Sequence, residues 1–272
     1  MSVDLAAFDK VHVYQRTATI SDITADLQAI GQFDVYHERQ RSKWGYLIAA
    51  SVLIGGGSFF MLVKSNVIQN QTAIAVVWLG SCLCLFIVGI VQYLKHDSSD
   101  LANRRYELIQ EVLRLLEKDS SRDEPVSVRL DLKIPNHATK RVREGDVGPW
   151  KVEYFQDPWL ELSGRFLDGT SYCLRGIEKY QSRWKTYRSR RGKRKSKSKS
   201  KSALQVTLML KPSTKHYAEP EAIANKLNST GQRPQWCQQK SAGLHKDRLQ
   251  LTAQTKAEWH GKPLPSQPDD KN

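Results

Sequence analysis

Two long uncharged apolar runs dominate the pattern of hydrophobic and polar positions along the chain. Residues 44–63 and residues 72–94 contain no Asp, Glu, Lys, Arg or His. As helices, each run would be about 30 to 35 Å long, which matches the roughly 30 Å hydrocarbon core of a bilayer. The pattern therefore predicts two transmembrane helices, with a pair of buried core helices as the alternative.

The positively charged residues around these runs predict their orientation. Seven Lys or Arg residues flank the outer ends of the pair, and only Lys64 lies in the short connection of residues 64–71. Cytoplasmic flanks of membrane helices are enriched in Lys and Arg. We therefore expect an antiparallel helical hairpin with a short extracytoplasmic loop, in an integral membrane protein that has both termini in the cytoplasm.

Small side chains within the two runs are candidates for close helix packing. Without a hydrophobic effect inside lipid, helices associate where small residues let their backbones approach. Packing within the hairpin is the favoured interpretation, and a seam between copies in a homo-oligomer is the alternative. The candidate residues are Ser51, Gly55, Gly56, Gly80 and Cys84.

The polar segments on either side of the apolar runs carry weaker patterns. Residues 1–43 form an N-terminal arm with a short strand at 11–20 and a helix that Ser21 can cap, and the arm is too short to bury a core alone. We expect it to lie on the membrane or to pack on the C-terminal domain. Residues 95–119 have apolar side chains at helical spacing, which predicts an amphipathic juxtamembrane helix.

From residue 120 onward the period changes to two, which is typical of β-strands. Strands are predicted at 126–134, 150–155, 159–167, 170–180, 203–210 and 247–259, with one helix at 220–227. Asp168-Gly169 marks a hairpin turn, and Asp157-Pro158 is interpreted as another turn. Residues 120–260 are therefore expected to form an antiparallel sandwich or partly open barrel, followed by a frayed tail at 261–272.

Positive charge is concentrated in one segment of this domain. The net charge of the 272 residues is +14, and residues 179–201 contain twelve Lys and Arg and no acidic residue, which leaves +2 for the rest. Lys193, Lys195, Lys197, Lys199 and Lys201 occupy alternate positions. In an extended strand, alternate side chains share one face.

This alternation predicts a two-stranded ribbon over residues 179–202 that reverses direction at 189–192. The alternative is a disordered, solvated loop. Because like charges repel, we expect the ribbon to be stable only against an anionic partner. The predicted anion- or lipid-binding residues are Lys179, Arg183, Trp184, Lys185, Arg188, Arg190, Arg191, Lys193, Arg194, Lys195, Lys197, Lys199 and Lys201.

Three function classes fit this pattern. The preferred one is a two-pass, membrane-anchored binding or scaffold module whose basic ribbon contacts anionic lipid head groups. The second is a membrane tether for nucleic acid or for an acidic protein assembly. The third is a small channel-like protein, which must be an oligomer because two helices cannot enclose a pore. A transporter is disfavoured because no ionisable residue lies inside either apolar run.

Catalytic and cofactor motifs are missing from the sequence. It contains no GxxxxGK[ST], GxGxxG, HExxH, GxSxG or CxxC pattern, so phosphate-binding loops, zinc proteases, serine hydrolases and redox-active cysteine pairs have no starting motif. The four cysteines are scattered and are expected to be free thiols. Cys237, His245 and His260 are unevenly spaced, and we predict neither a metal site nor a cofactor.

Overall fold

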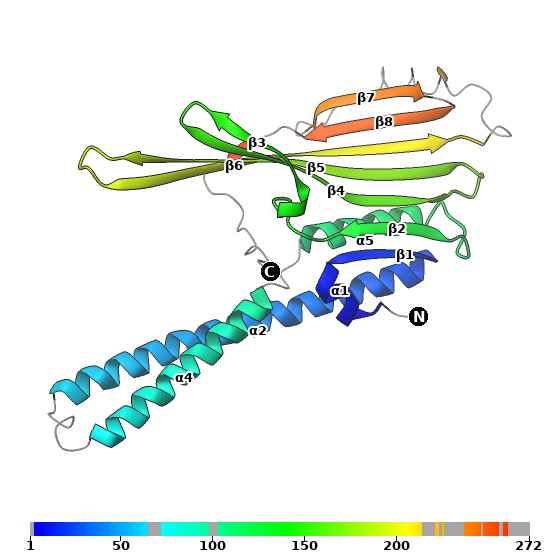
Figure 1. The fold of residues 1–272 in the computed structure, drawn as a ribbon. Helices are drawn as coiled ribbons and strands as arrows, with labels where there is room; N and C mark the ends of the chain where they lie inside the picture. The colour runs from blue at the N-terminus through cyan, green and yellow to red at the C-terminus, as the bar shows by residue number, and fades with distance from the viewer. Residues whose placement is uncertain are drawn as a thin grey trace. The chain divides into compact units, whose positions relative to one another are not determined.

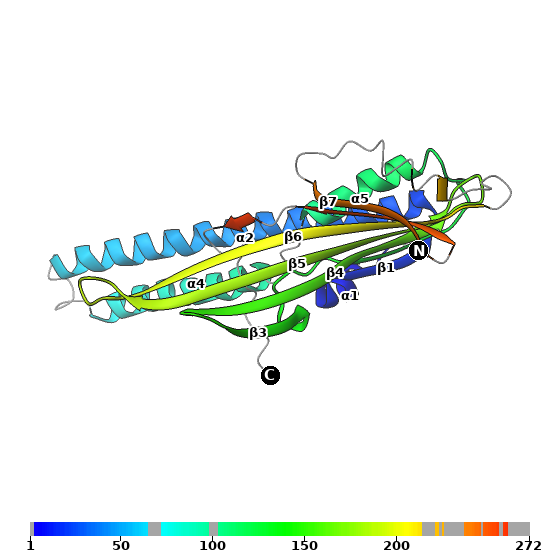
Figure 2. The same ribbon diagram turned by 90° about the horizontal axis from the view of Figure 1, so that it is seen from above.

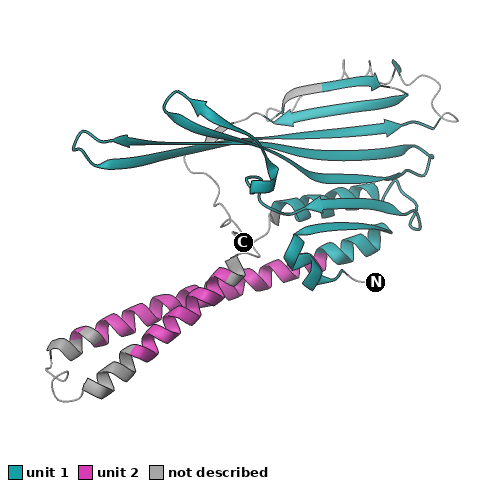
Figure 3. Cartoon of the chain, in the orientation of Figure 1, with its two compact units in different colours: residues 1–27, 102–272 teal, residues 28–101 magenta. Residues whose placement is uncertain are grey.

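The computed structural model describes residues 3–64, 72–97, 103–213, 221–222, 225, 237–245, 247–255 and 258–260. The chain divides into two compact units, residues 1–27 with 102–272 and residues 28–101, as Figure 3 shows by colour. Each unit is described here by itself.

The first unit is built on a single antiparallel sheet with nine strands among the described residues. The strand order is β1-β2-β4-β5-β6-β8-β7, while β3 pairs with β4 and β9 pairs with β6 (Figure 1). The strands are β1 Val13–Ala18, β2 Val126–Asp131, β3 Arg141–Val147, β4 Trp150–Arg165, β5 Ser171–Arg188, β6 Arg194–Lys211, β7 Cys237–His245, β8 Arg248–Thr255 and β9 Glu258–His260.

This single sheet differs from the sandwich or partly open barrel that the sequence predicted. The difference arises because β4 runs on through Asp157, where the register shifts, and does not turn back there. Strands β5 and β6 are also longer than predicted, with 18 residues each. The turn at Asp168-Gly169 is confirmed, because Gly169 has a φ of +84° and the Asp168 side chain accepts a hydrogen bond from the Thr170 backbone.

The N-terminal arm belongs to this sheet. Strand β1 pairs with β2 over six residue pairs, from Val13 with Asp131 to Ala18 with Val126. The helix α1 (Leu5–Val11) precedes β1, and α2 (Ile20–Lys64) follows it. Of the two predicted positions for the arm, the structure therefore has the one on the C-terminal domain.

Helices line one face of the sheet and enclose the core with it. Ile23 and Leu27 of α2, and Ile109 and Leu113 of α5 (Asn103–Leu116), are fully buried, as is Leu130 of β2. A Leu or Ile side chain buried in this way contributes about 1.5–3 kcal/mol relative to an exposed one. Figures 1 and 2 show α5 along the sheet, and we call the side that it covers the helix face.

Side chains alternate between the helix face and the opposite face along each strand. Leu162 of β4, Leu174 of β5 and Leu208 of β6 are neighbours in register on the helix face. Ser163 and Cys173, one position along, are neighbours on the opposite face. Because the pairing of β5 with β6 has no register shift, this alternation continues along both strands to their connecting turn.

In the second unit, α2 continues and contacts α4 (Thr72–Asp97). A Cβ atom built on Gly89 would lie 2.9 Å from Cγ1 of Ile48, and one built on Gly55 would lie 3.4 Å from Cβ of Cys82. Glycine at these positions therefore lets the two helices approach closely.

The two predicted transmembrane helices are not borne out. In the part of the chain that the structure describes, no helix is both long enough and apolar enough to cross a membrane. Residues 44–63 are the last part of one 45-residue helix, α2, which also includes the charged residues Glu38, Arg39 and Lys43. The predictions of a membrane hairpin, a two-pass integral membrane protein and two cytoplasmic termini are therefore wrong.

The structure describes only parts of several other predicted segments. Of the predicted helix at 95–119, residues 95–97 belong to α4 and residues 103–116 form α5. Residues 98–102 lie outside the described residues, so one continuous helix stays a prediction. Residues 65–71 of the predicted loop, most of the predicted helix at 220–227, and the tail at 261–272 lie outside the described residues.

Candidate functional site: the cationic face of a two-stranded ribbon

Strands β5 and β6 form a long ribbon that extends past the rest of the sheet. Their pairing is continuous from Ser171 with Lys211 to Arg188 with Arg194. Figures 1 and 2 both show the two strands running on beyond the start of β4. This pairing agrees with the ribbon that the Lys/Ser alternation predicted.

The turn of the ribbon is at the predicted place. The backbone N–H of Ser189 donates to the carbonyl of Lys193 at 2.8 Å, and that of Gly192 donates to the carbonyl of Ser189 at 2.9 Å. Gly192 has a φ of +75°, a conformation that glycine adopts without steric cost. A left-handed glycine at the end of a short loop is a common way to close a β-hairpin.

The register separates the ribbon's side chains by chemistry. Lys197 lies opposite Lys185, Lys199 opposite Arg183, and Lys201 opposite Gln181, all on one face. The other face of the ribbon has mainly hydroxyl groups, with Ser196 opposite Thr186 and Ser200 opposite Ser182. We call the first the cationic face; its ribbon members are Arg183, Lys185, Lys195, Lys197, Lys199 and Lys201.

The predicted anion-binding residues therefore do not form one set. Trp184 lies on the hydroxyl face, as do Arg188 and Arg194. Lys179 is on the cationic side, but its ammonium group donates to the side-chain oxygen of Gln205 at 3.0 Å. Arg190, Arg191 and Lys193 are in the turn.

Residues of β3 and β4 extend the cationic face, and sequence reasoning missed them. The Trp150 ring has the Arg183 guanidinium carbon 4.7 Å from its centroid and the Lys185 ammonium also at 4.7 Å. Arg143 of β3 pairs in register with Tyr154 of β4, and its guanidinium carbon is 5.9 Å from that ring. Cation–π contacts of this kind hold a flexible cationic side chain in place.

Acidic residues near the ribbon point to the other face. Glu153 pairs with Ser182, and Glu144 pairs with Glu153, so both side chains share the hydroxyl face. Glu153 accepts a hydrogen bond from Arg141 at 2.8 Å. Among the described residues of β3, of β4 from Trp150 to Gln156 and of the ribbon, no Asp or Glu lies on the cationic face.

The cationic face is therefore electrostatically unfavourable by itself. In the described part of the chain, Lys195, Lys197 and Lys199 have no carboxylate within 4.0 Å. Directly opposed like charges on paired strands are destabilising. Two ammonium groups separated by two residues of a strand, about 6.7 Å, repel by about 0.6 kcal/mol in water.

A buried ion cluster lies at the base of this ribbon. Asp157 of β4 is fully buried; one carboxylate oxygen lies 2.7 Å from Arg105 of α5, and the other lies 2.8 Å from Lys140. Arg105 also contacts Glu178 at 2.9 Å and donates to the backbone carbonyls of Asp131 and Lys133. The sequence interpretation of Asp157 as a turn residue missed this role, because an isolated Asp-Pro pair is more typical of turns.

The predicted helix-packing residues lie in the second unit. Of these, Gly55 faces Cys82 of α4, and the Ser51 hydroxyl donates to the carbonyl of Ile48 at 2.8 Å. A Cβ atom on Gly56 or Gly80 would meet no described atom within 4 Å, and Cys84 is exposed.

Comparisons with known proteins leave the site to be interpreted from its own geometry. No protein-family model, curated protein or solved structure matches this chain. Among the described residues, no group of three or more His, Cys, Asp or Glu side chains could hold a metal ion.

Proposed function

We propose that this chain is a non-enzymatic binding protein whose cationic face holds the phosphate backbone of single-stranded nucleic acid. The observation that carries the proposal is the charge separation on the ribbon. Six Lys and Arg residues of β5 and β6 share one face, whereas the nearby carboxylates of Glu144 and Glu153 lie on the other.

The cations form lines, which favours a chain-like ligand. Lys195, Lys197, Lys199 and Lys201 follow one strand, so their Cα atoms repeat about every 6.6 to 6.8 Å. Arg183 and Lys185 form a second, parallel row on the neighbouring strand. A linear polyanion can neutralise both rows at once and would remove the repulsion between them.

The chemistry of the face favours binding without sequence selectivity. Lysine ammonium groups contact phosphates as point charges and do not read base edges. Proteins that bind single strands in this way usually add aromatic side chains on which bases stack. Tyr187, which is 43% exposed and lies opposite Lys195, is the candidate for stacking. The Lys185 ammonium is 5.9 Å from its ring centroid, farther than the 4.7 Å of the two cations at Trp150.

The test measures binding of a fluorescent single-stranded oligonucleotide of about 20 nucleotides, longer than the roughly 4–16 nucleotides that one binding module covers. The full chain is compared with the variant K195Q/K197Q/K199Q/K201Q. A matched control, R188Q/R190Q/R191Q/R194Q, also removes four charges, but from the turn and the hydroxyl face. We expect the lysine variant to lose more than about tenfold in affinity and the control to lose much less.

Anionic lipid head groups and an acidic protein are competing partners, and the same variants separate them from nucleic acid. Vesicles containing phosphatidylserine should compete weakly with the oligonucleotide. If vesicles displace it completely at low lipid concentration, the face binds lipid and the nucleic-acid proposal is wrong. Equal losses for the two variants would show that net charge, and not the cationic face, controls binding.

A further inference from the structure

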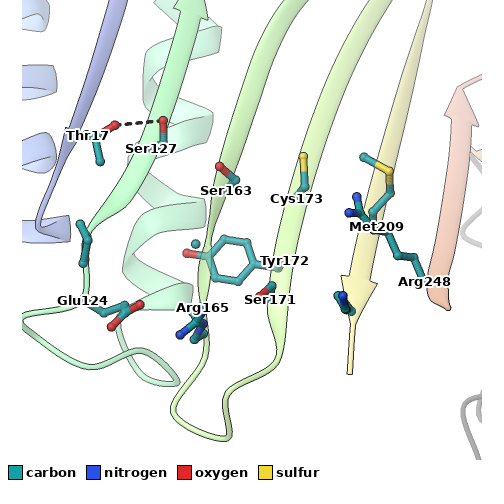
Figure 4. Close-up of a pocket in the computed structure, with 13 residues that line it drawn as sticks. Thr17, Glu124, Ser127, Ser163, Arg165, Ser171, Tyr172, Cys173, Met209 and Arg248 are labelled. Carbon is teal, nitrogen blue, oxygen red and sulfur yellow. Dashed lines mark hydrogen bonds between the residues drawn. The ribbon is translucent and has the colours of Figure 1, made fainter. Parts of the chain in front are cut away.

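A second polar site lies on the same side of the sheet as the cationic face, near the other end of β5 and β6. It is a hollow of about 420 Å³ whose lining comes from β1, β2, β4, β5, β6 and β8 (Figure 4). This volume is within the range of roughly 300–1,000 Å³ that is typical of small-molecule sites. It exceeds what a single inorganic anion occupies.

Hydroxyl groups form the floor of this hollow. Thr17, Ser127 and Ser163 are neighbours in register on three adjacent strands, and Cys173 continues the row on the next strand. The Thr17 hydroxyl donates to Ser127 at 3.1 Å. A row of hydroxyl groups can both donate to and accept from a ligand that has hydroxyl groups of its own.

Cationic side chains stand around the hydroxyl row. Arg165, Lys211 and Arg248 line the hollow, and Glu124 is the acidic residue in its lining. Among the described residues, Arg165 and Arg248 have no carboxylate within 4.0 Å, whereas Lys211 lies 3.6 Å from Asp247. Two guanidinium groups without an internal partner are suited to a ligand oxyanion, because Arg presents paired donors to phosphate.

We infer that this hollow is a binding site for a small phosphate ester that carries hydroxyl groups, such as a pentose phosphate. Arg165 of β4 and Arg248 of β8 approach the phosphate from the two sides of β5 and β6, and the hydroxyl groups of Ser127 and Ser163, next to Arg165, bind the polyol. The inference stands on the hollow alone and does not depend on the proposed function of the ribbon.

Cys173 provides a direct readout of occupancy. Its thiol is free, partly exposed and part of the lining, so a bound ligand would cover it. Burial raises the pKa of the Cys173 thiol above its ordinary value, so alkylation should be slow at neutral pH. Cys84 is exposed and lies in the other unit, where it serves as an internal control.

The experiment follows alkylation of Cys173 and Cys84 in the full chain by mass spectrometry, with ribose 5-phosphate as the probe. We expect ribose 5-phosphate to slow alkylation at Cys173 and not at Cys84, and ribose or inorganic phosphate to protect much less. R165Q and R248Q should each raise the half-protecting concentration roughly five- to tenfold. R129Q, which removes an exposed arginine outside the lining, should leave it unchanged.

Several results would overturn the inference. Millimolar ribose 5-phosphate could fail to protect Cys173, or ribose alone could protect it equally. Equal protection by inorganic phosphate would contradict the role of the hydroxyl row. Unchanged protection in R165Q and R248Q, with circular dichroism like that of the parent, would show that the guanidinium groups hold no ligand.

Discussion

The ion cluster at Asp157 of β4 and the cationic face of β5 and β6 lie on neighbouring strands, but their charges are balanced in opposite ways. At Asp157, which is fully buried, Arg105 and Lys140 contact the two carboxylate oxygens. On the ribbon, Lys195, Lys197 and Lys199 have no carboxylate within 4.0 Å in the described part of the chain. Buried charges need partners inside the protein, whereas exposed charges can remain available for an external one.

The largest expected effect is at the buried cluster. D157N removes the charge that Arg105 and Lys140 share, and leaves two buried cations with fewer partners. Removing one partner of a buried ion pair typically costs about 3–5 kcal/mol, and because Glu178 and Asp131 remain, we expect about 3 kcal/mol. Urea unfolding followed by circular dichroism measures the change.

The matched control for D157N is the exposed pair of Glu111 and Arg114 on α5, which are 2.5 Å apart. E111Q should leave the unfolding midpoint nearly unchanged, because solvent screens an exposed pair. If D157N were as mild as E111Q, the buried cluster would not be a stabilising feature and the comparison would fail.

A smaller effect is expected where an aromatic ring supports the cationic face. W150A removes the ring that contacts Arg183 and Lys185, at about 0.5–1 kcal/mol for each cation–π contact. We therefore expect the free energy of unfolding to fall by about 1–2 kcal/mol, and oligonucleotide affinity to fall several-fold because the two cations lose their fixed positions. W150F should retain most of both, and a W150A protein with unchanged affinity would contradict this role of the ring.

Removing the row of lysines should stabilise the free protein. K195Q/K197Q/K199Q/K201Q relieves repulsion of about 0.6 kcal/mol or less for each neighbouring pair, so thermal unfolding should shift upward by a few degrees at low salt. At 1 M salt the screening length is about 3 Å, and the shift should disappear. A variant that is less stable at both salt concentrations would mean that the lysines make stabilising contacts within the chain.

The smallest effect concerns a buried histidine, His12, whose charged form is disfavoured by burial. Burial lowers the pKa of His12, with Asp9 opposing the shift from 3.9 Å. Because the unfolded chain binds the proton more readily, stability should be complete above the ordinary pKa of 6.5 and decrease as the pH falls below it. H12N keeps a residue that tolerates the left-handed backbone at this position, where φ is +51°, and should lose this pH dependence between pH 7.5 and 5.

The regular parts of the ribbon were predictable from sequence because alternation and turn chemistry are local. Lysines at every second position from Lys195 to Lys201 place their side chains on one face of a strand, and the glycine at 192 marks the reversal. The residues of β3 and β4 that extend this face were not predictable. Trp150 and Arg143 reach it only because the register of β4 shifts between Asp157 and Leu160, which no local pattern indicates.

The prediction of two transmembrane helices failed because it also relied on a local pattern. An uncharged run reports the polarity of a segment but not where its helix begins, and α2 begins at Ile20, 24 residues before Trp44. Asp157 was misinterpreted because its partners Arg105 and Lys140 are 52 and 17 residues away in sequence, and only the fold brings them together.

The salt dependence of oligonucleotide binding tests the central claim about the cationic face most directly. For a single strand, the logarithm of the binding constant falls by about 0.7 per neutralised phosphate for each tenfold rise in salt, so six cations predict a slope near −4. K195Q/K197Q/K199Q/K201Q should reduce the slope to about −1.5, while R188Q/R190Q/R191Q/R194Q should keep most of it. Equal slopes for the two variants, or no salt dependence in the parent protein, would contradict the account.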